Sequence, residues 1–279
     1  MDIRQILREY DALFRNASPE EIHAFLAEHI RMAEEEGDLG ALLTLLNEQV
    51  GYARDTDREE IVLRSGQRIL DLLPEMGLQG TVPCGNSLLN VATAYRAYGH
   101  YEEAAALFPE VEKAFQNSLE EGAYEFAGLY NNWSLLHIER KNKEEAIRLI
   151  RKAIEVTDRY ERAVIRQATS RGNLAVALLD LAKDVDPERA RELREEARKA
   201  LAEAAERHEA KGGQDYHYAA ILSAAADMQT EEGRYEEAAE NYQRAMDIIR
   251  MYMGENQKVE MLARKRKLAL AAASGKAVQ

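Results

Sequence analysis

The sequence has 279 residues, 46% of them hydrophobic, and a formal net charge of −13 from 37 basic and 50 acidic residues. A chain of this length can bury a substantial core, and its negative charge repels nucleic-acid backbones and anionic membrane surfaces, so neither is an expected partner. Cys84 is the single cysteine, which excludes an intrachain disulfide and a thiolate zinc site and fits a reducing compartment. No secretion signal opens the sequence, and no apolar run approaches the roughly 20 residues of a membrane span, so we expect a cytoplasmic protein.

Two helices are predicted at the N-terminal end. Apolar residues recur at helical spacing over about 3–15, beginning with Ile3, Ile6 and Leu7. The stretch Ser18-Pro19-Glu20-Glu21 forms a capping box with proline at the first helical position, which predicts that a second helix covers 19–36. No later run alternates as a β-strand would, so the fold class is expected to be all-α.

A short phrase then recurs along the chain. It reads "DREEIV" at 57–62, "HYEEAA" at 100–105, "NKEEAI" at 142–147 and "RYEEAA" at 234–239. Its small or branched fifth position falls at Ile61, Ala104, Ala146 and Ala238, in steps of 43, 42 and 92 residues. The long last step leaves room for one more repeat, which predicts five helix pairs over 38–254.

The fourth of these pairs carries an insertion. Asp186-Pro187 marks the start of its second helix, over 187–212, and Ala197, Leu201 and Ala204 continue the repeat spacing there, with Ala190 as an alternative register. Gly212-Gly213 ends this helix.

The remaining elements complete one predicted domain over 1–279. It consists of an N-terminal helix pair (1–37), five repeats (38–254) and a C-terminal capping helix and tail (255–279), with the closing helix at about 257–273. The least regular connection, 75–86, is predicted to be a surface loop that contains Cys84.

The repeats carry a specific set of apolar and small residues. The second repeat has Leu88, Val91, Ala92, Tyr95, Gly99, Tyr101, Ala104, Phe108 and Val111, and the fifth has Leu222, Ala225, Ala226, Gly233, Tyr235, Ala238, Tyr242 and Ala245. This pattern resembles the tetratricopeptide repeat, a helical hairpin. Steps of 42 or 43 residues rather than about 34 imply helices longer by about two turns, and such variants are similar to the repeats of kinesin light chains and of bacterial peptide-sensing regulators.

The resemblance implies a fold and a function. The fold would be a right-handed α-solenoid of antiparallel helix pairs, about 13 helices in all, with a concave face lined by the first helix of each pair. The function would be that of a non-catalytic scaffold that binds a peptide or a partner-protein segment in this groove.

One lane of asparagines runs through the first helices of the repeats. Asn47, Asn90, Asn132 and Asn173 each stand 14 residues before the repeat marker, and Ala224 takes their place in the fifth repeat. The resemblance directs this lane into the groove, beside a flanking lane of Leu46, Leu89, Asn131, Gly172 and Ser223. Because an amide both donates and accepts hydrogen bonds, a ladder of asparagines can hold the backbone of an extended peptide.

The predicted peptide-binding residues are therefore Asn47, Asn90, Asn131, Asn132, Asn173, Leu46 and Leu89, with Arg96 toward one end. The alternative interpretation is structural, since each asparagine could bond a neighbouring helix and hold the stacking angle.

No other pattern indicates chemistry. The histidines lack metal-ligand spacing, and no phosphate loop or catalytic triad is visible, so neither an enzyme nor a cofactor is expected. The basic cluster "ARKRK" at 263–267 is interpreted as a solvated helix face. The alternative function is an assembly or oligomerisation module, natural or engineered, and the sequence leaves the ligand and the oligomeric state open.

Overall fold

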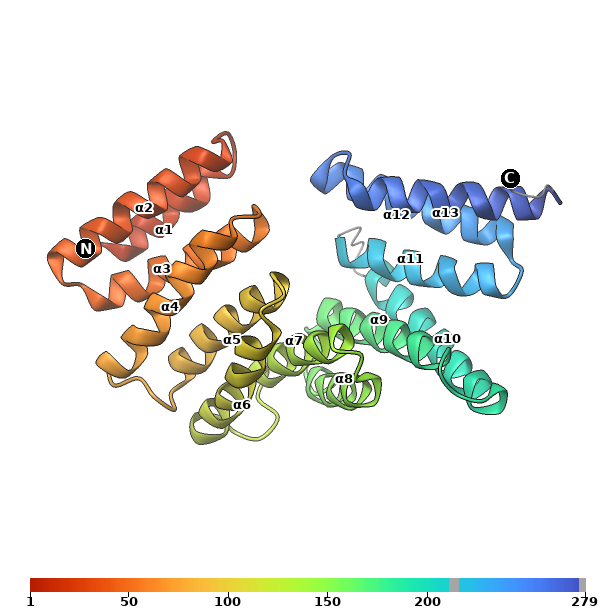
Figure 1. Ribbon diagram of the computed structural model, residues 1–279, viewed down its shortest axis with the longest axis horizontal. Helices are drawn as coiled ribbons and strands as arrows, with labels where there is room; N and C mark the ends of the chain where they lie inside the picture. Colours follow the sequence, from red (N-terminus) through yellow and green to blue (C-terminus); the bar gives the residue numbers. More distant parts are fainter. Residues whose placement is uncertain (211–215, 276–279) are drawn as a thin grey trace. The chain divides into compact units, whose positions relative to one another are not determined.

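A computed structural model describes residues 1–210 and 216–275. Within these residues the chain forms thirteen α-helices and no β-strand, so the all-α helical-repeat fold is confirmed (Figure 1). The helices are α1 (Ile3–Leu13), α2 (Pro19–Glu36), α3 (Leu39–Asp55), α4 (Glu59–Glu75), α5 (Val82–Ala97), α6 (Tyr101–Ser118), α7 (Glu125–Glu139), α8 (Lys143–Thr157), α9 (Val164–Leu181), α10 (Pro187–Ala210), α11 (Tyr216–Glu231), α12 (Tyr235–Met253) and α13 (Gln257–Ala273). The predicted break at Gly212-Gly213 lies outside the described residues.

Several helix ends follow from local side-chain chemistry. The backbone N–H of Ser18 donates to Glu21 Oε2 at 2.7 Å and the backbone N–H of Glu21 donates to Ser18 Oγ at 3.3 Å, which forms the predicted capping box. Gly37 ends α2 with a φ of 68°, a left-handed conformation that glycine adopts without strain. The predictions for 19–36 and for the closing helix at 257–273 are confirmed, whereas the first helix ends at Leu13 instead of residue 15.

The predicted loop at 75–86 is too long. Helix α5 begins at Val82 because Thr81 caps it, with its Oγ1 accepting from the backbone N–H of Cys84 at 3.3 Å, and because Pro83 suits a first helical turn. Cys84 therefore lies in a helix, is buried, and has a pKa raised above its ordinary value mainly by that burial. This environment suppresses the reactive thiolate.

The helices form two compact units, residues 1–132 and 133–279, with the boundary inside α7. In unit 1, α3 lies beside α4 and α5 lies beside α6 (Figure 1). In unit 2, α9 packs on α10, α11 packs on α12, and α13 also packs on α12. A single domain over 1–279 stays a prediction.

Small residues occupy the positions where the helices approach closely. Ala104, Ala146 and Ala238 each have 0% exposure, as the repeat alignment predicts. In the fourth pair, Ala190, Ala197, Leu201 and Ala204 are all buried as well. A methyl group at these positions lets neighbouring backbones approach while larger side chains fill the gaps.

Within the described residues, no helix is both long enough and apolar enough to cross a bilayer.

Glu48 on α3 gives unit 1 a pH dependence. Burial, together with the nearby Asp11 carboxylate, raises its pKa above the ordinary value. A raised folded-state pKa means that the carboxyl group stabilises the fold most below its unfolded pKa, and that this contribution is lost as the pH rises through the folded pKa. Glu48→Gln should therefore increase the free energy of unfolding at pH 7.

Urea denaturation at pH 4 and pH 7 checks this prediction. The increase in the free energy of unfolding should be smaller at pH 4. The control is Glu110→Gln, at an exposed position on α6, which should have little effect on stability at either pH. A Glu48→Gln variant that is less stable than the parent at pH 7 would contradict the sign.

Candidate functional site

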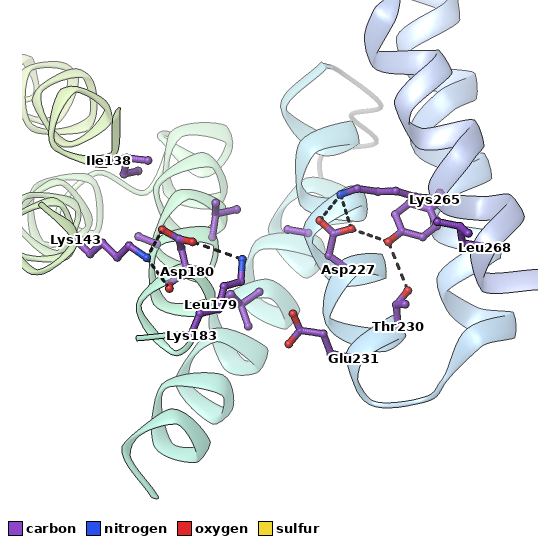
Figure 2. Close-up of a pocket in the computed structure, with 14 residues that line it drawn as sticks. Ile138, Lys143, Leu179, Asp180, Lys183, Asp227, Thr230, Glu231, Lys265 and Leu268 are labelled. Carbon is purple, nitrogen blue, oxygen red and sulfur yellow. Dashed lines mark hydrogen bonds and ion pairs between the residues drawn. The ribbon is translucent and has the colours of Figure 1, made fainter. Parts of the chain in front are cut away.

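A groove runs between α9 and α11 in unit 2, with α13 as an additional wall (Figure 2). Its main pocket has a volume of about 510 Å³, and an adjoining pocket of about 230 Å³ shares Val176, Ala224 and Asp227 with it. We call both together the α9–α11 groove. Its apolar lining includes Ile138, Val176, Leu179, Ala224, Met261 and Leu268. Val176 is 45% exposed and Leu268 is 50% exposed, so the groove offers apolar surface to a ligand.

One ion-pair network fixes the α13 wall. Lys265 Nζ on α13 donates to both carboxylate oxygens of Asp227 on α11, at 2.7 and 2.8 Å. Tyr242 on α12 donates its hydroxyl proton to Asp227 Oδ1 at 2.6 Å. Burial, and then this bond, raise the pKa of Tyr242 well above its ordinary range, so the hydroxyl remains a donor. Asp227 thus ties three helices together.

A second network fixes the opposite end. Lys143 Nζ, at the start of α8, lies 2.8 Å from Asp180 Oδ2 and 2.7 Å from Asp184 Oδ2, and it also donates to the main-chain oxygen of Asp180 at 2.9 Å. The hydrogen bonds to Asp180 and Asp184 raise the pKa of Lys143, and the bond from Lys143 lowers the pKa of Asp180. Both groups therefore stay charged, and α8 is held against the end of α9.

The charged side chains of the groove are held in ion pairs. The carboxylates of the groove are engaged by cations: Asp180 by Lys143, Asp227 by Lys265, and Glu231 by Arg194 at 3.6 Å. Among the described residues no group of three or more histidine, cysteine, aspartate or glutamate side chains could hold a metal ion. What the groove offers is a preformed apolar trough with charged groups fixed at its rim, a composition typical of ligand sites.

Two members of the asparagine lane, Asn47 and Asn90, join α3 to α5. Asn47 Nδ2 on α3 donates to Leu43 O at 2.9 Å and to Ser87 Oγ on α5 at 3.0 Å. Asn90 Nδ2 on α5 donates back to Asn47, to its main-chain oxygen at 2.9 Å and to its Oδ1 at 3.2 Å. These bonds favour the structural interpretation for Asn47 and Asn90, and peptide contact by either stays a prediction.

The other predicted site residues have different surroundings. Asn131 and Asn132 on α7 donate to carbonyls of their own helix, Ala127 O at 3.0 Å and Gly128 O at 2.9 Å. In the flanking lane Leu46 is buried and Leu89 is half-buried. Arg96, in the last turn of α5, is also half-buried.

The lane does reach the groove in unit 2. Ala224, its fifth-repeat member, lines both pockets. Asn173 stands three residues before Val176 and seven before Asp180, which places it on the same face of α9 one turn from the groove. Residues that follow a lane member by three or seven positions lie on the same face of its helix. This spacing leads from Asn173 to Asp180 and from Ala224 to Asp227, so it is the sequence signal that would have identified both aspartates.

The asparagine bonds predict different effects of two matched substitutions on stability. Asn90→Ala removes both bonds to Asn47 and should lower the free energy of unfolding by about 1–2 kcal/mol, because the bonds between α5 and α3 are lost and Asn47 Oδ1 loses this donor. Asn132→Ala removes only a bond within α7 and should change stability by less than about 0.5 kcal/mol, because alanine is the better helix former. Urea denaturation of both variants measures these changes. If Asn90→Ala unfolds with the free energy of the parent, the α3–α5 bonds do not contribute to stability.

No protein-family model and no curated protein matches the sequence. Solved structures do match the fold. A putative kinesin light chain from P. anserina with nearly identical TPR-like repeats superposes with a TM-score of 0.57 at 15% identity, over 76% of this chain and 97% of that one. The chain has a tetratricopeptide-repeat fold. The tetratricopeptide-repeat resemblance drawn from the sequence is confirmed at this level.

Two further structures match nearly the whole tetratricopeptide-repeat array. The apo form of RapI has a TM-score of 0.64 at 13% identity, over 98% of this chain and 72% of RapI. Yeast Tom70 has a TM-score of 0.58 at 13% identity, over 98% of this chain but only 54% of Tom70. Identities this low establish the fold alone.

The basic cluster at 263–267 needs one correction. The prediction of a solvated helix face is wrong for Lys265, which lines the groove and pairs with Asp227. Lys265, at the inner edge of the cluster, joins α13 to α11, and Arg264, at 82% side-chain exposure, remains on the solvated side.

Proposed function

We propose that this chain is a non-catalytic tetratricopeptide-repeat scaffold that binds a peptide or a partner-protein segment in the α9–α11 groove. The observation that supports this function best is the exposed apolar lining of the groove between two fixed ion-pair networks. The walls are held before a ligand arrives, so less ordering entropy is lost on binding. A cytoplasmic location is part of the proposal and rests on the single cysteine.

The groove would contact both the side chains and the backbone of the ligand. Apolar ligand side chains would pack on Val176, Leu179 and Leu268, where they displace water from exposed aliphatic surface. Asn173, one turn away on α9, is the lane asparagine that belongs to the same unit as the groove, and its amide is proposed to bond the ligand backbone. A segment of this kind is expected to bind with micromolar affinity, since ordering a flexible chain offsets much of the contact energy.

Selection followed by photo-crosslinking tests this function. Peptides of about 15 residues would be selected on the purified protein from a random display library, then resynthesised with one benzoylphenylalanine. Mass spectrometry of the irradiated complex should locate crosslinks on α9, α11 and α13. Crosslinks confined to other helices, or the absence of any saturable binder, would contradict the proposal.

A further inference from the structure

A second pocket lies in unit 1, apart from the groove assigned above. It has a volume of about 530 Å³ and is formed by side chains of α2, α3 and α4. Ile30 and Leu46 give it an apolar portion, and three arginines, Arg31, Arg64 and Arg68, supply its cations. We call it the α2–α4 pocket. Its volume falls in the range of small-molecule sites.

Gln49 gives this pocket an available hydrogen-bond donor. The residue is only 4% exposed and lines the pocket from α3. Its Oε1 accepts a bond from Ser65 Oγ at 2.6 Å, which orients the amide. No hydrogen bond within the described part of the chain engages its Nε2. A buried amide with an unused donor is satisfied best by a ligand that presents an acceptor.

Arg31 is neutralised by ion pairs with Glu28 and Glu35, whereas Arg64 and Arg68 are under-neutralised. Arg64 and Arg68 are four residues apart on α4, so their side chains are neighbours, and like charges at this spacing destabilise a helix. Arg68 has only a loose pair with Glu34, at 3.8 Å, and Arg64 forms no ion pair with the described residues. Asp71, the other carboxylate of the lining, accepts from Gln67 Nε2 at 2.9 Å. An anion placed between Arg64 and Arg68 would relieve their repulsion.

We propose that the α2–α4 pocket binds a small organic anion. Its carboxylate or phosphate lies between Arg64 and Arg68, because guanidinium groups match the planar oxygen pairs of both anions. Its apolar portion contacts Ile30 and Leu46, and an acceptor group receives the hydrogen of Gln49 Nε2. This pocket shares no lining residue with the α9–α11 groove, so the anion-binding proposal does not depend on the peptide-binding function.

Isothermal titration with defined ligands tests this site. Phenyl phosphate and benzoate carry the two anions on the same apolar ring, and benzyl alcohol is their neutral counterpart. At low salt, in a buffer without phosphate, at least one of the two anions should bind saturably at one site with a Kd below about 1 mM, and benzyl alcohol should not. The double variant Arg64→Gln/Arg68→Gln should weaken binding at least fivefold, because it removes both cations while keeping polar side chains.

Arg8→Gln is the matched control, since Arg8 is exposed on α1 and lies outside the pocket. It should bind the anions as the parent does. Failure of both anions to bind, equal binding by the double variant, or equal loss in the Arg8→Gln control would overturn the proposal. If phenyl phosphate binds and benzoate does not, the site is a phosphate site, and the reverse result assigns it to carboxylates.

Discussion

Gly85→Ala should lower the free energy of unfolding by about 1–3 kcal/mol, although the same change usually stabilises a helix interior. A β-carbon at Gly85 on α5 would stand 2.5 Å from Cε1 and 2.7 Å from Cδ1 of Phe115 on α6. Phe115 has 0% exposure, so its ring has little room to retreat from the added methyl group. The pair should repack only by separating α5 from α6.

Gly51→Ala is the matched control, because Gly51 lies inside α3 and a β-carbon there meets no atom within 4 Å. This variant should gain about 0.5–1 kcal/mol through helix propensity. Urea denaturation of both proteins tests the α5–α6 packing. Two changes of the same sign would show that the contact between Gly85 and Phe115 is not as close as the structure places it.

Val176→Asp combined with Leu268→Asp should weaken binding of a selected peptide at least tenfold, which corresponds to about 1.4 kcal/mol or more. Both side chains line the α9–α11 groove and are about half exposed, so aspartate there stays hydrated and the fold should be preserved. What the variant loses is apolar contact, and the new carboxylates must be desolvated when a peptide covers them. Fluorescence anisotropy with the labelled peptide measures the loss.

Met251→Asp controls for the chemical change. Met251 is 65% exposed near the end of α12, and it does not line the groove. This variant should bind the peptide as the parent does and show the same helical circular dichroism. Equal weakening by Met251→Asp would mean that the added negative charge, and not the groove contact, controls binding.

The sequence predicts much of the fold because the signals are local. Ser18, Pro19 and Gly37 define α2 through bonds and backbone angles within a few residues, and the recurrent small position marks where helices pack. The prediction of a loop over 75–86 is wrong for a related reason. Its three glycines and one proline suggest irregular structure, but Thr81 and Pro83 form a helix start, and the later Gly85 is required by the Phe115 ring.

The candidate site could be predicted only in part, since its chemistry depends on distances between helices. The spacing of Asn47 and Asn90 identifies one face of two helices, but it does not reveal that the amide of Asn90 reaches the backbone of Asn47. Likewise, nothing near Lys265 in the sequence indicates that it pairs with Asp227, which is 38 residues away. Periodicity finds the lane, and only the packed structure shows which members bond each other.

The central claim is that the α9–α11 groove receives the ligand, and methyl NMR tests it most directly. A selected peptide would be titrated into protein labelled at isoleucine, leucine and valine methyl groups. The methyl signals of Val176, Leu179 and Leu268 should shift saturably with one Kd, while that of Leu26, which is fully buried in unit 1, should not move. Saturable binding that leaves the three groove signals in place and shifts others would contradict the account.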